Sequence, residues 1–408
     1  MTELDTSLFI RDTVRPLVKR FENLRFSGYI QSQYQVISKD GAKTYGGGDF
    51  SDHSRSRFML RRARMKMDYL ALTDDKLPRA LFSFQVDATE RSVRVRDMFI
   101  RIFETKKNNF SLTTGVFARP FGFEVNLSSS YRETPERGRM SQILLPSERD
   151  LGAMISYEPQ RKNAHNHFIK ADVGVFNGPG LSATTDFDSK RDFIGRVILK
   201  PFRKKKIEMS GSVSVLYGGW EQISKFVYKV DMSPSGNKSF LVDSAASNIG
   251  KTAPRHYYGA DFQLKWLHGW GITEWRAEYW TGKQSGTALT TANPGTLPIV
   301  PTFIRNFNGA FFYFLQNIVN SKNQLLVKYD WYDPNTRIAG NEIGKAGTNF
   351  TDSDIKFSTL GVGFARDITN TVKAVLYYEI VKNETTLLTG YTTDLKDNLF
   401  TCRLQFRF

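Results

Sequence analysis

Apolar side chains stand at every second position in many short stretches of this chain, which is the period of a β-strand and differs from that of a helix. The last stretch, 400–408, alternates phenylalanine, cysteine and leucine with threonine, arginine and glutamine. The stretches 323–332 and 271–281 divide in the same way into a largely apolar face and a face that carries charge. The pattern therefore predicts strands whose two faces meet different surroundings.

Clusters of Gly, Pro, Asn, Asp and Ser divide the chain into about sixteen such strands. They are expected at 24–37, 56–70, 79–87, 93–103, 109–118, 150–158, 165–176, 192–201, 206–219, 255–266, 271–281, 304–316, 323–332, 354–365, 370–381 and 397–408. Links after even-numbered strands are mostly short and links after odd-numbered strands are mostly long, with the short link 88–92 as the exception. This alternation places the long loops at one end of the sheet and both chain termini at the other.

Strands of about ten residues with long loops on one side are typical of an outer-membrane barrel. We therefore expect an all-β fold, a transmembrane up-and-down antiparallel β-barrel over 24–408, in the bacterial outer membrane and in contact with its lipid and lipopolysaccharide. A soluble β-sandwich is the alternative, but it gives no reason for one-sided loops. Residues 1–23 are expected to form a short N-terminal periplasmic segment or a disordered leader. No secretory signal pattern opens the chain, so we expect that a signal peptide has been removed.

The chain contains 57 Lys and Arg residues against 41 Asp and Glu residues, a formal net charge of +16. Such a charge together with 13% aromatic residues often marks a nucleic-acid binder. Here the basic residues alternate with an apolar face around a closed sheet, so no nucleic-acid partner is expected. The single cysteine, Cys402, excludes a disulfide framework and a Cys-based zinc site.

Charged residues in a membrane barrel default to the lumen, because a lipid-facing Arg or Lys costs about 2–4 kcal/mol at the bilayer midplane. Sixteen strands enclose an aqueous channel, and rows of Arg and Lys along such a channel favour anions. The residues expected to guide small anions are Arg62, Arg64, Lys66, Arg119, Arg196, Arg276, Lys328 and Arg403. The alternative is a generic wall in which these cations pair with acidic neighbours.

The geometry of the strand 93–103 stays open at this point. Arg94 and Arg96 have one parity along it, whereas Asp97 and Arg101 have the other. Either a β-bulge or a stretch that faces another subunit would explain this mixed pattern.

The long loop 119–149 is rich in Arg and Glu, Glu124 among them. Folded into the lumen, it would set the narrowest point of the pore. Turned outward, it would only shape the vestibule. The composition of the loop favours neither arrangement.

No catalytic constellation stands out in the sequence. The five histidines are scattered over loops and strand ends, so we expect no enzyme, no metal site and no cofactor. The other candidate functions are a general or oligosaccharide porin, or a barrel whose long extracellular loops serve a protein partner. Tryptophans along a sugar track would support a sugar porin, although aromatic girdles at the membrane interfaces are the usual place for such residues.

Several stretches, read in order, resemble the phosphate-selective porin O/P family of outer-membrane channels, and the opening GYIQSQYQ resembles its members from Bacteroidetes. The stretches are LRFSGYIQSQYQ at 24–35, RFMLRRARMKM at 57–67, VRDMFIRI at 95–102, TGVFARPFGFEVNLSSS at 114–130, PSERDLG at 146–152, VGVFNGPG at 173–180, YGADF at 258–262, AEYWTG at 277–282 and VKYDWYDPN at 327–335. The likeness extends from Leu24 to the terminal Phe408. We expect the barrel-assembly machinery to recognise Phe408.

This resemblance implies a homotrimer of sixteen-stranded barrels, a third loop folded inward and a passive anion channel of the phosphate type. Arg62 and Arg64 of RRAR would belong to an arginine ladder. Asp97 of RDMF and Arg119 of ARPFG would lie at the constriction, where Glu124 of the same loop is a further candidate. The paired constriction lysines of the family have no counterpart here, so the resemblance predicts anion preference and leaves phosphate preference open.

Overall fold

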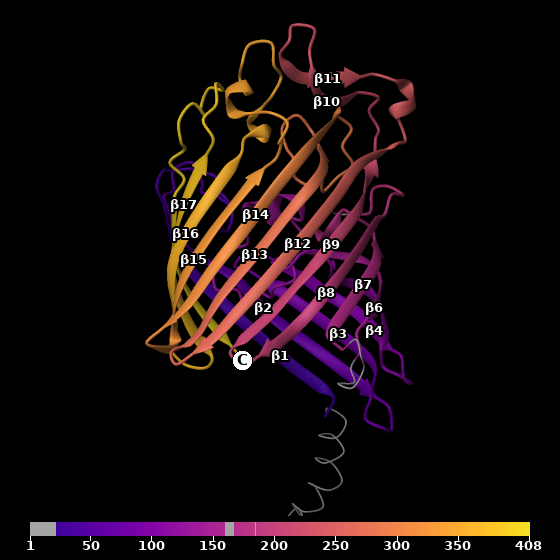
Figure 1. Cartoon of the computed structure of the whole chain (residues 1–408), viewed down its shortest axis with the longest axis vertical. Coiled ribbons are helices and arrows are strands. Elements are labelled where there is room, and N and C mark those ends of the chain that lie inside the picture. Colours follow the sequence, from indigo (N-terminus) through magenta and orange to yellow (C-terminus); the bar gives the residue numbers. More distant parts are fainter. Residues whose placement is uncertain (1–21, 160–166, 184) are drawn as a thin grey trace, which may run out of the picture.

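The computed structural model describes residues 22–159, 167–183 and 185–408. Sixteen antiparallel strands close into a tilted barrel (Figure 1). They are β1 (Leu24–Ile37), β2 (Ser56–Leu72), β3 (Pro78–Ala88), β4 (Val93–Phe103), β5 (Phe110–Ala118), β6 (Arg149–Tyr157), β7 (Ile169–Phe176), β8 (Asp192–Lys204), β9 (Ile207–Glu221), β12 (Thr252–His268), β13 (Gly271–Gly286), β14 (Thr302–Ile318), β15 (Asn320–Asp333), β16 (Phe357–Asp367), β17 (Val372–Asn383) and β18 (Leu399–Arg407). Strand β1 pairs with both β2 and β18, which closes the ring.

All sixteen predicted strands are confirmed, and the long loops lie at the end opposite the C terminus (Figure 1). The predicted N-terminal segment falls almost entirely on residues 1–21, outside the described residues. One hairpin was not predicted. Its strands, β10 (Val227–Met232) and β11 (Lys238–Asp243), lie within the long link 220–254. Their six-residue length is too short for a clear alternating pattern.

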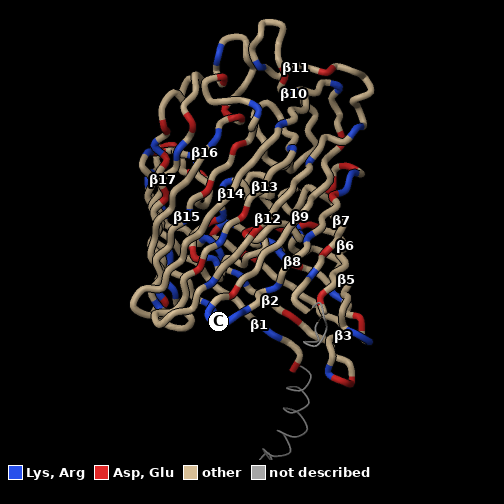
Figure 2. Tube along the Cα trace, in the orientation of Figure 1, with Lys and Arg blue, Asp and Glu red and all other residues tan. Residues whose placement is uncertain are grey.

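The two faces of the strands meet the surroundings that the alternation predicts. In β18, Cys402, Leu404 and Phe406 are exposed on the outside, whereas Thr401, Arg403 and Gln405 are buried inside the barrel. Figure 2 shows basic and acidic residues interleaved along the strands of the barrel. No helix in the described part of the chain is long and apolar enough to cross a membrane.

Two β-bulges add cations to the lumen. Gln31 pairs with Arg62 and Ser32 with Leu60, so Arg61 is an extra residue in β2. Strand β4 has the same feature, because Gln85 pairs with Asp97 and Val86 with Val95, which leaves Arg96 extra. The bulge in β4 explains the mixed pattern of this strand.

The segment 119–148, here called the inner loop, folds into the barrel and contacts its wall at β2 and β4 on one side and at β13 and β15 on the other. It contains the short helix α3 (Arg139–Leu144). Apolar side chains of the loop and of the wall form one buried cluster, which includes Phe121, Met140, Leu144, Leu216, Tyr257, Trp280 and Phe307. The loop therefore fills part of the lumen, and the sequence composition alone could not decide this.

The hairpin β10–β11 is fastened over the mouth of the barrel. Strand β10 runs parallel to the start of β14, and Phe240 of β11 packs against Phe303 and Phe350. The amide of Asn349 accepts the backbone N–H of Phe240 and donates to its carbonyl, which satisfies the free edge of β11. The hairpin β10–β11 and the loop 334–356 are thereby joined over the mouth of the barrel, and together they are here called the cap.

Candidate functional site

The inner loop is held across the barrel by four of its own carboxylates. Glu136 lies at the centre of the strongest cluster. It binds Arg61 at 2.8 Å, Arg62 at 2.6 Å and Arg403 at 3.1 Å, so three cations from β2 and β18 share one carboxylate. Because the cluster keeps an excess of two positive charges, it fixes the loop without neutralising this part of the wall.

Glu148 forms a second cluster of the same composition. Its carboxylate contacts Arg96 closely, Arg137 at 3.3 Å and Arg149 at 3.4 Å. Arg149 in turn binds Asp97 at 2.9 Å. The bulge at Arg96 is what brings a cation of β4 to this carboxylate.

Glu124 anchors the loop on the opposite wall. Its carboxylate accepts hydrogen bonds from Lys328 at 2.9 Å, from the hydroxyl of Tyr313 and from the N–H of Gly138. Glu133 supplies the fourth anchor and binds Arg276 at 2.7 Å. Glu124 and Lys328 have almost no exposed surface, so this pair acts in holding the loop in place.

Arg119 is fully buried, with 0% of its surface exposed. Its guanidinium donates to the carbonyls of Ser147 and Gly178 and lies 3.8 Å from Asp150. These contacts tie the start of the inner loop to its end and to the neighbouring loop. Since no water-filled surface reaches Arg119, its contacts are structural in this conformation.

All eight residues that were expected to guide anions line the inside of the barrel or the inner loop, and each has a carboxylate within 4.0 Å. The pairs are Arg62 and Arg403 with Glu136, Arg64 with Asp87, Lys66 with Asp68, Arg119 with Asp150, Arg196 with Asp261, Arg276 with Glu133 and Glu274, and Lys328 with Glu124 and Asp330. A row of paired cations therefore runs along the wall.

Two cavities of 540 and 310 Å³ lie on the side of the inner loop that faces the C terminus. Lys66 lines both of them. Their charged lining consists of seven basic residues and two acidic ones: Arg64, Lys66, Arg101, Arg149, Lys170, Arg196 and Arg407 with Asp97 and Asp172. Basic residues thus outnumber acidic ones in the lining of these two cavities, here called the basic cavities.

Several lumenal arginines have no carboxylate oxygen within 4.0 Å in the part of the chain that the structure describes; besides Arg57, Arg94 and Arg139 towards the long loops, they are Arg101, Arg407 and Arg132. Arg101 donates to Thr113 and Arg407 lies over the ring of Tyr131, and both line the basic cavities. Arg132 of the inner loop is only 5% exposed. None of these three was among the residues expected to guide anions. For Arg101 the reason is the bulge at Arg96, because this bulge decides which residues of β4 face the lumen.

A third cavity of 620 Å³ lies on the other side of the inner loop, towards the long loops. Arg149 lines it as well as one of the basic cavities. Six arginines and four carboxylates border it: Arg57, Arg61, Arg91, Arg94, Arg96 and Arg149 with Asp49, Asp87, Glu90 and Glu148. Positive charge therefore exceeds negative charge on both sides of the inner loop.

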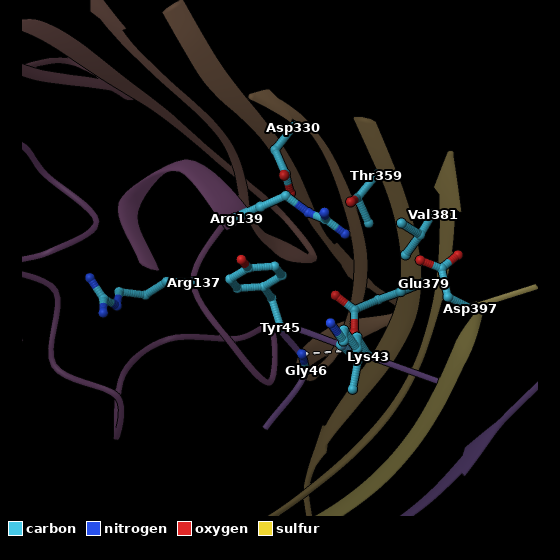
Figure 3. A pocket seen from close by; sticks show the side chains of 11 residues that line it. Lys43, Tyr45, Gly46, Arg137, Arg139, Asp330, Thr359, Glu379, Val381 and Asp397 are labelled. Carbon is cyan, nitrogen blue, oxygen red and sulfur yellow. Dashed lines mark hydrogen bonds between the residues drawn. The ribbon is translucent and has the colours of Figure 1, made fainter. Parts of the chain in front are cut away.

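A small, balanced pocket lies at the opposite wall of this mouth (Figure 3). Arg139 lies over the ring of Phe357 at 3.6 Å and over Tyr45 at 4.7 Å, among strands that carry Asp330 and Glu379. Asp397, in the loop before β18, borders the same pocket. Burial raises the pKa of Asp397 to about 6, and Arg139 opposes this rise.

The tryptophans do not form a sugar track in the described lumen. Trp266, Trp270 and Trp275 are exposed, whereas Trp220 and Trp280 are fully buried. Such outward tryptophans are typical of a membrane-interface girdle. Among the described residues, no group of three or more His, Cys, Asp or Glu side chains is arranged to hold a metal ion.

No protein-family model matches the sequence, and no curated protein matches it. Solved outer-membrane structures do match the fold. An anion-selective porin from Comamonas acidovorans is 10% identical over 94% of this chain and 99% of that chain, with a TM-score of 0.55. The Pseudomonas putida protein OprB is 9% identical over 98% and 96%, with a TM-score of 0.57. The outer-membrane protein OmpT of Vibrio cholerae, in a trimer form, is 9% identical over 94% and 99%, with a TM-score of 0.52. The chain therefore has the barrel fold of these proteins.

Proposed function

We propose that the protein is a passive diffusion channel of the bacterial outer membrane with a preference for small anions. The observation that carries the proposal is the lining of the basic cavities, where seven basic residues outnumber two acidic ones and where Arg101 and Arg407 have no carboxylate oxygen within 4.0 Å among the described residues. Low-dielectric walls focus the field of such an excess and raise the local concentration of anions. The Comamonas acidovorans porin of the same fold is described as anion-selective, which agrees with this proposal.

Within the basic cavities, Arg101 and Arg407 are the residues that attract anions. The other cations are held by carboxylates at short distances, for example Arg64 by Asp87 at 2.9 Å and Lys66 by Asp68 at 2.8 Å. A paired cation presents a dipole to a passing ion, whereas an unpaired one presents a full charge. The paired ladder then serves as a polar wall along which an anion meets several weak sites.

The experiment is the reversal potential of the purified protein in a planar bilayer under a KCl gradient. A unit charge about 8 Å from an ion in water is worth ~0.5 kcal/mol, which is roughly a twofold change in local anion concentration. The potassium concentration changes twofold in the opposite sense, so the double substitution Arg101→Gln and Arg407→Gln should lower the chloride-to-potassium permeability ratio by up to roughly 16-fold. Lys225→Gln and Lys229→Gln, with both lysines exposed at the cap, are the control with the same change in charge and should leave the ratio unchanged.

A cation-selective wild type would overturn the proposal. Phosphate is the solute that the resemblance to the phosphate-selective porin O/P family implies, and a titration with millimolar phosphate under chloride tests it. A chloride current that phosphate does not reduce would remove phosphate from the proposal while leaving anion selectivity in place.

We further propose that the barrel assembles as a homotrimer. Strands β3 to β7 are 8–11 residues long, whereas β12 to β15 are 14–17, so the wall is lower on one side. Val93 and Val95 at the top of this low wall are exposed, and neighbouring subunits would cover them. Light scattering of the detergent-solubilised protein gives the test, and a monomeric mass would refute the trimer.

A further inference from the structure

The turn between β8 and β9 carries four consecutive cations at the end of the barrel that holds the C terminus. Residues 203–206 are Arg-Lys-Lys-Lys, and all four are exposed. None of them has a carboxylate oxygen within 4.0 Å among the residues that the structure describes. Glu208, which pairs with Arg203 across the ladder, is bound instead by Lys265 at 3.4 Å. The turn therefore presents its full positive charge to its surroundings.

Apolar and aromatic side chains surround this turn on the outer face of the barrel. Phe202 and Ile207, on its two arms, are 43% and 44% exposed. Trp266 of β12 pairs with Ile207. Trp270 lies in the turn between β12 and β13, and just before this turn the N–H of Leu267 donates to the carbonyl of Lys206. Both tryptophans are exposed. Rings at this height are typical of the boundary between hydrocarbon and headgroups.

Lys204 connects the charged turn with this aromatic boundary. It pairs with Ile207 across the hairpin and follows Phe202 by two residues, so it lies on the outer face. A lysine stem beside apolar residues can extend along them and place its ammonium at the depth of lipid phosphates. Lys205 and Lys206, at the tip of the turn, lie at the same edge.

The other described turns at this end of the barrel contain no such run of consecutive residues with the same charge. The turn 73–77 contains two aspartates and one lysine, and 366–371 contains Arg366 beside Asp367. The turn 104–109 combines Glu104 with two lysines. The positive charge is thus localised at one hairpin, as expected for a discrete site and not for a uniform charged belt.

We propose that this hairpin, defined by Phe202, residues 203–206 and Ile207, binds the phosphate groups of anionic phospholipids in the leaflet that borders the C-terminal end of the barrel. The ammonium and guanidinium groups recognise the phosphodiester, while the flanking rings fix the depth of the lipid. This inference goes beyond the proposed channel function and shares with it only the membrane-embedded barrel.

The test uses the purified full chain in a zwitterionic detergent, equilibrated with equal amounts of phosphatidylglycerol and phosphatidylcholine and read by native mass spectrometry. The wild type should bind phosphatidylglycerol in preference. The triple variant Lys204→Gln, Lys205→Asn and Lys206→Gln should lose this preference by roughly 100-fold, since each cation near a lipid surface contributes roughly fivefold. Asparagine is chosen at position 205 because Lys205 has a φ of +54°, a conformation that Asn tolerates.

The matched control is Lys39→Gln, Lys225→Gln and Lys229→Gln, three exposed lysines in the loops at the opposite end. It changes the net charge equally and should retain the lipid preference. The reversal potential of the triple variant should equal that of the wild type, which separates this proposal from the channel proposal. A triple variant that still prefers phosphatidylglycerol, or a control that loses the preference equally, would overturn the inference.

Two measurements on the wild type need no variant. The preference should fall steeply between 0.05 and about 0.5 M NaCl, because exposed charges are screened within a Debye length. Millimolar inorganic phosphate should displace little of the bound lipid, since it lacks the acyl chains that the rings contact. Complete displacement would identify a free-phosphate site instead, and binding of a soluble polyanion without lipid preference would identify a polymer site; either result refutes the lipid assignment.

Discussion

Replacing Glu136 by glutamine tests whether its carboxylate holds the inner loop in the lumen. The substitution keeps the size of the side chain and removes the charge that Arg61, Arg62 and Arg403 share at 2.6–3.1 Å. Removing one partner from a buried ion pair costs about 3–5 kcal/mol, because the remaining charge is buried without compensation. Three arginines lose the carboxylate that they share here, so we expect the free energy of unfolding to fall by an amount at the upper end of this range.

The assay for this loss is equilibrium unfolding in guanidinium chloride, followed by tryptophan fluorescence of the detergent-solubilised barrel. Glu133→Gln is the matched control in the same loop. Its partner Arg276 keeps Glu274 at 2.7 Å, so the expected cost is only about 1–2 kcal/mol. Equal unfolding midpoints for the wild type, Glu136→Gln and Glu133→Gln would show that the three-arginine cluster does not stabilise the barrel.

The same substitution also has an electrical consequence. It adds one unit of positive charge to the lumen and frees two arginines of β2 to face passing ions. The permeability ratio of chloride to potassium should therefore rise, by roughly fourfold for one charge at about 8 Å, because the anion gains and the cation loses about twofold each. A fall in this ratio would contradict the position that the structure gives to Glu136.

Three further predictions concern other parts of the molecule. Asp397→Asn should raise stability at pH 7–8 and leave it unchanged near pH 4, as read from thermal unfolding across pH. The reason is that the folded pKa of about 6 exceeds the ordinary value, so ionisation destabilises the wild type as the pH rises from about 4 to above 6. Asp354→Asn should cost about 3–5 kcal/mol locally and expose the cap to limited proteolysis, because it leaves the fully buried Arg305, now 2.8 Å away, without its partner. Gly115→Ala should reduce the yield of folded barrel on gels that separate folded from unfolded chains, since Gly115 has a φ of +119° and a Cβ there would lie 2.4 Å from the carbonyl oxygen of Met98.

The barrel itself could be predicted from the sequence because each strand carries its own evidence. Alternation along β18 or β15 separates the two faces without reference to any other strand. The bulges at Arg61 and Arg96 could not be located in this way. A bulge shifts the register against a partner strand, so it becomes visible only when the pairing of β2 with β1 or of β4 with β3 is known.

The position of the inner loop depends on contacts that are still less local. Its sequence contains four arginines and four glutamates, so its composition is neutral and shows no preference for lumen or solvent. The preference arises from partners far along the chain: Glu124 meets Lys328, and Glu136 meets Arg403. Alternation predicted that Lys328 and Arg403 face the lumen, but it could not reveal which carboxylates they meet there.

This pairing changes what a row of arginines means for function. If every lumenal cation were free, each would attract anions, and the channel would hold them tightly. In the structure the inner loop brings its own carboxylates to the wall, and Glu136 and Glu148 each satisfy three arginines. In the proposed channel, anion preference would then depend on cations without a carboxylate partner, such as Arg101 and Arg407 at the basic cavities. Weak attraction at a small number of sites is what rapid conduction requires, because an ion must leave each site as readily as it enters.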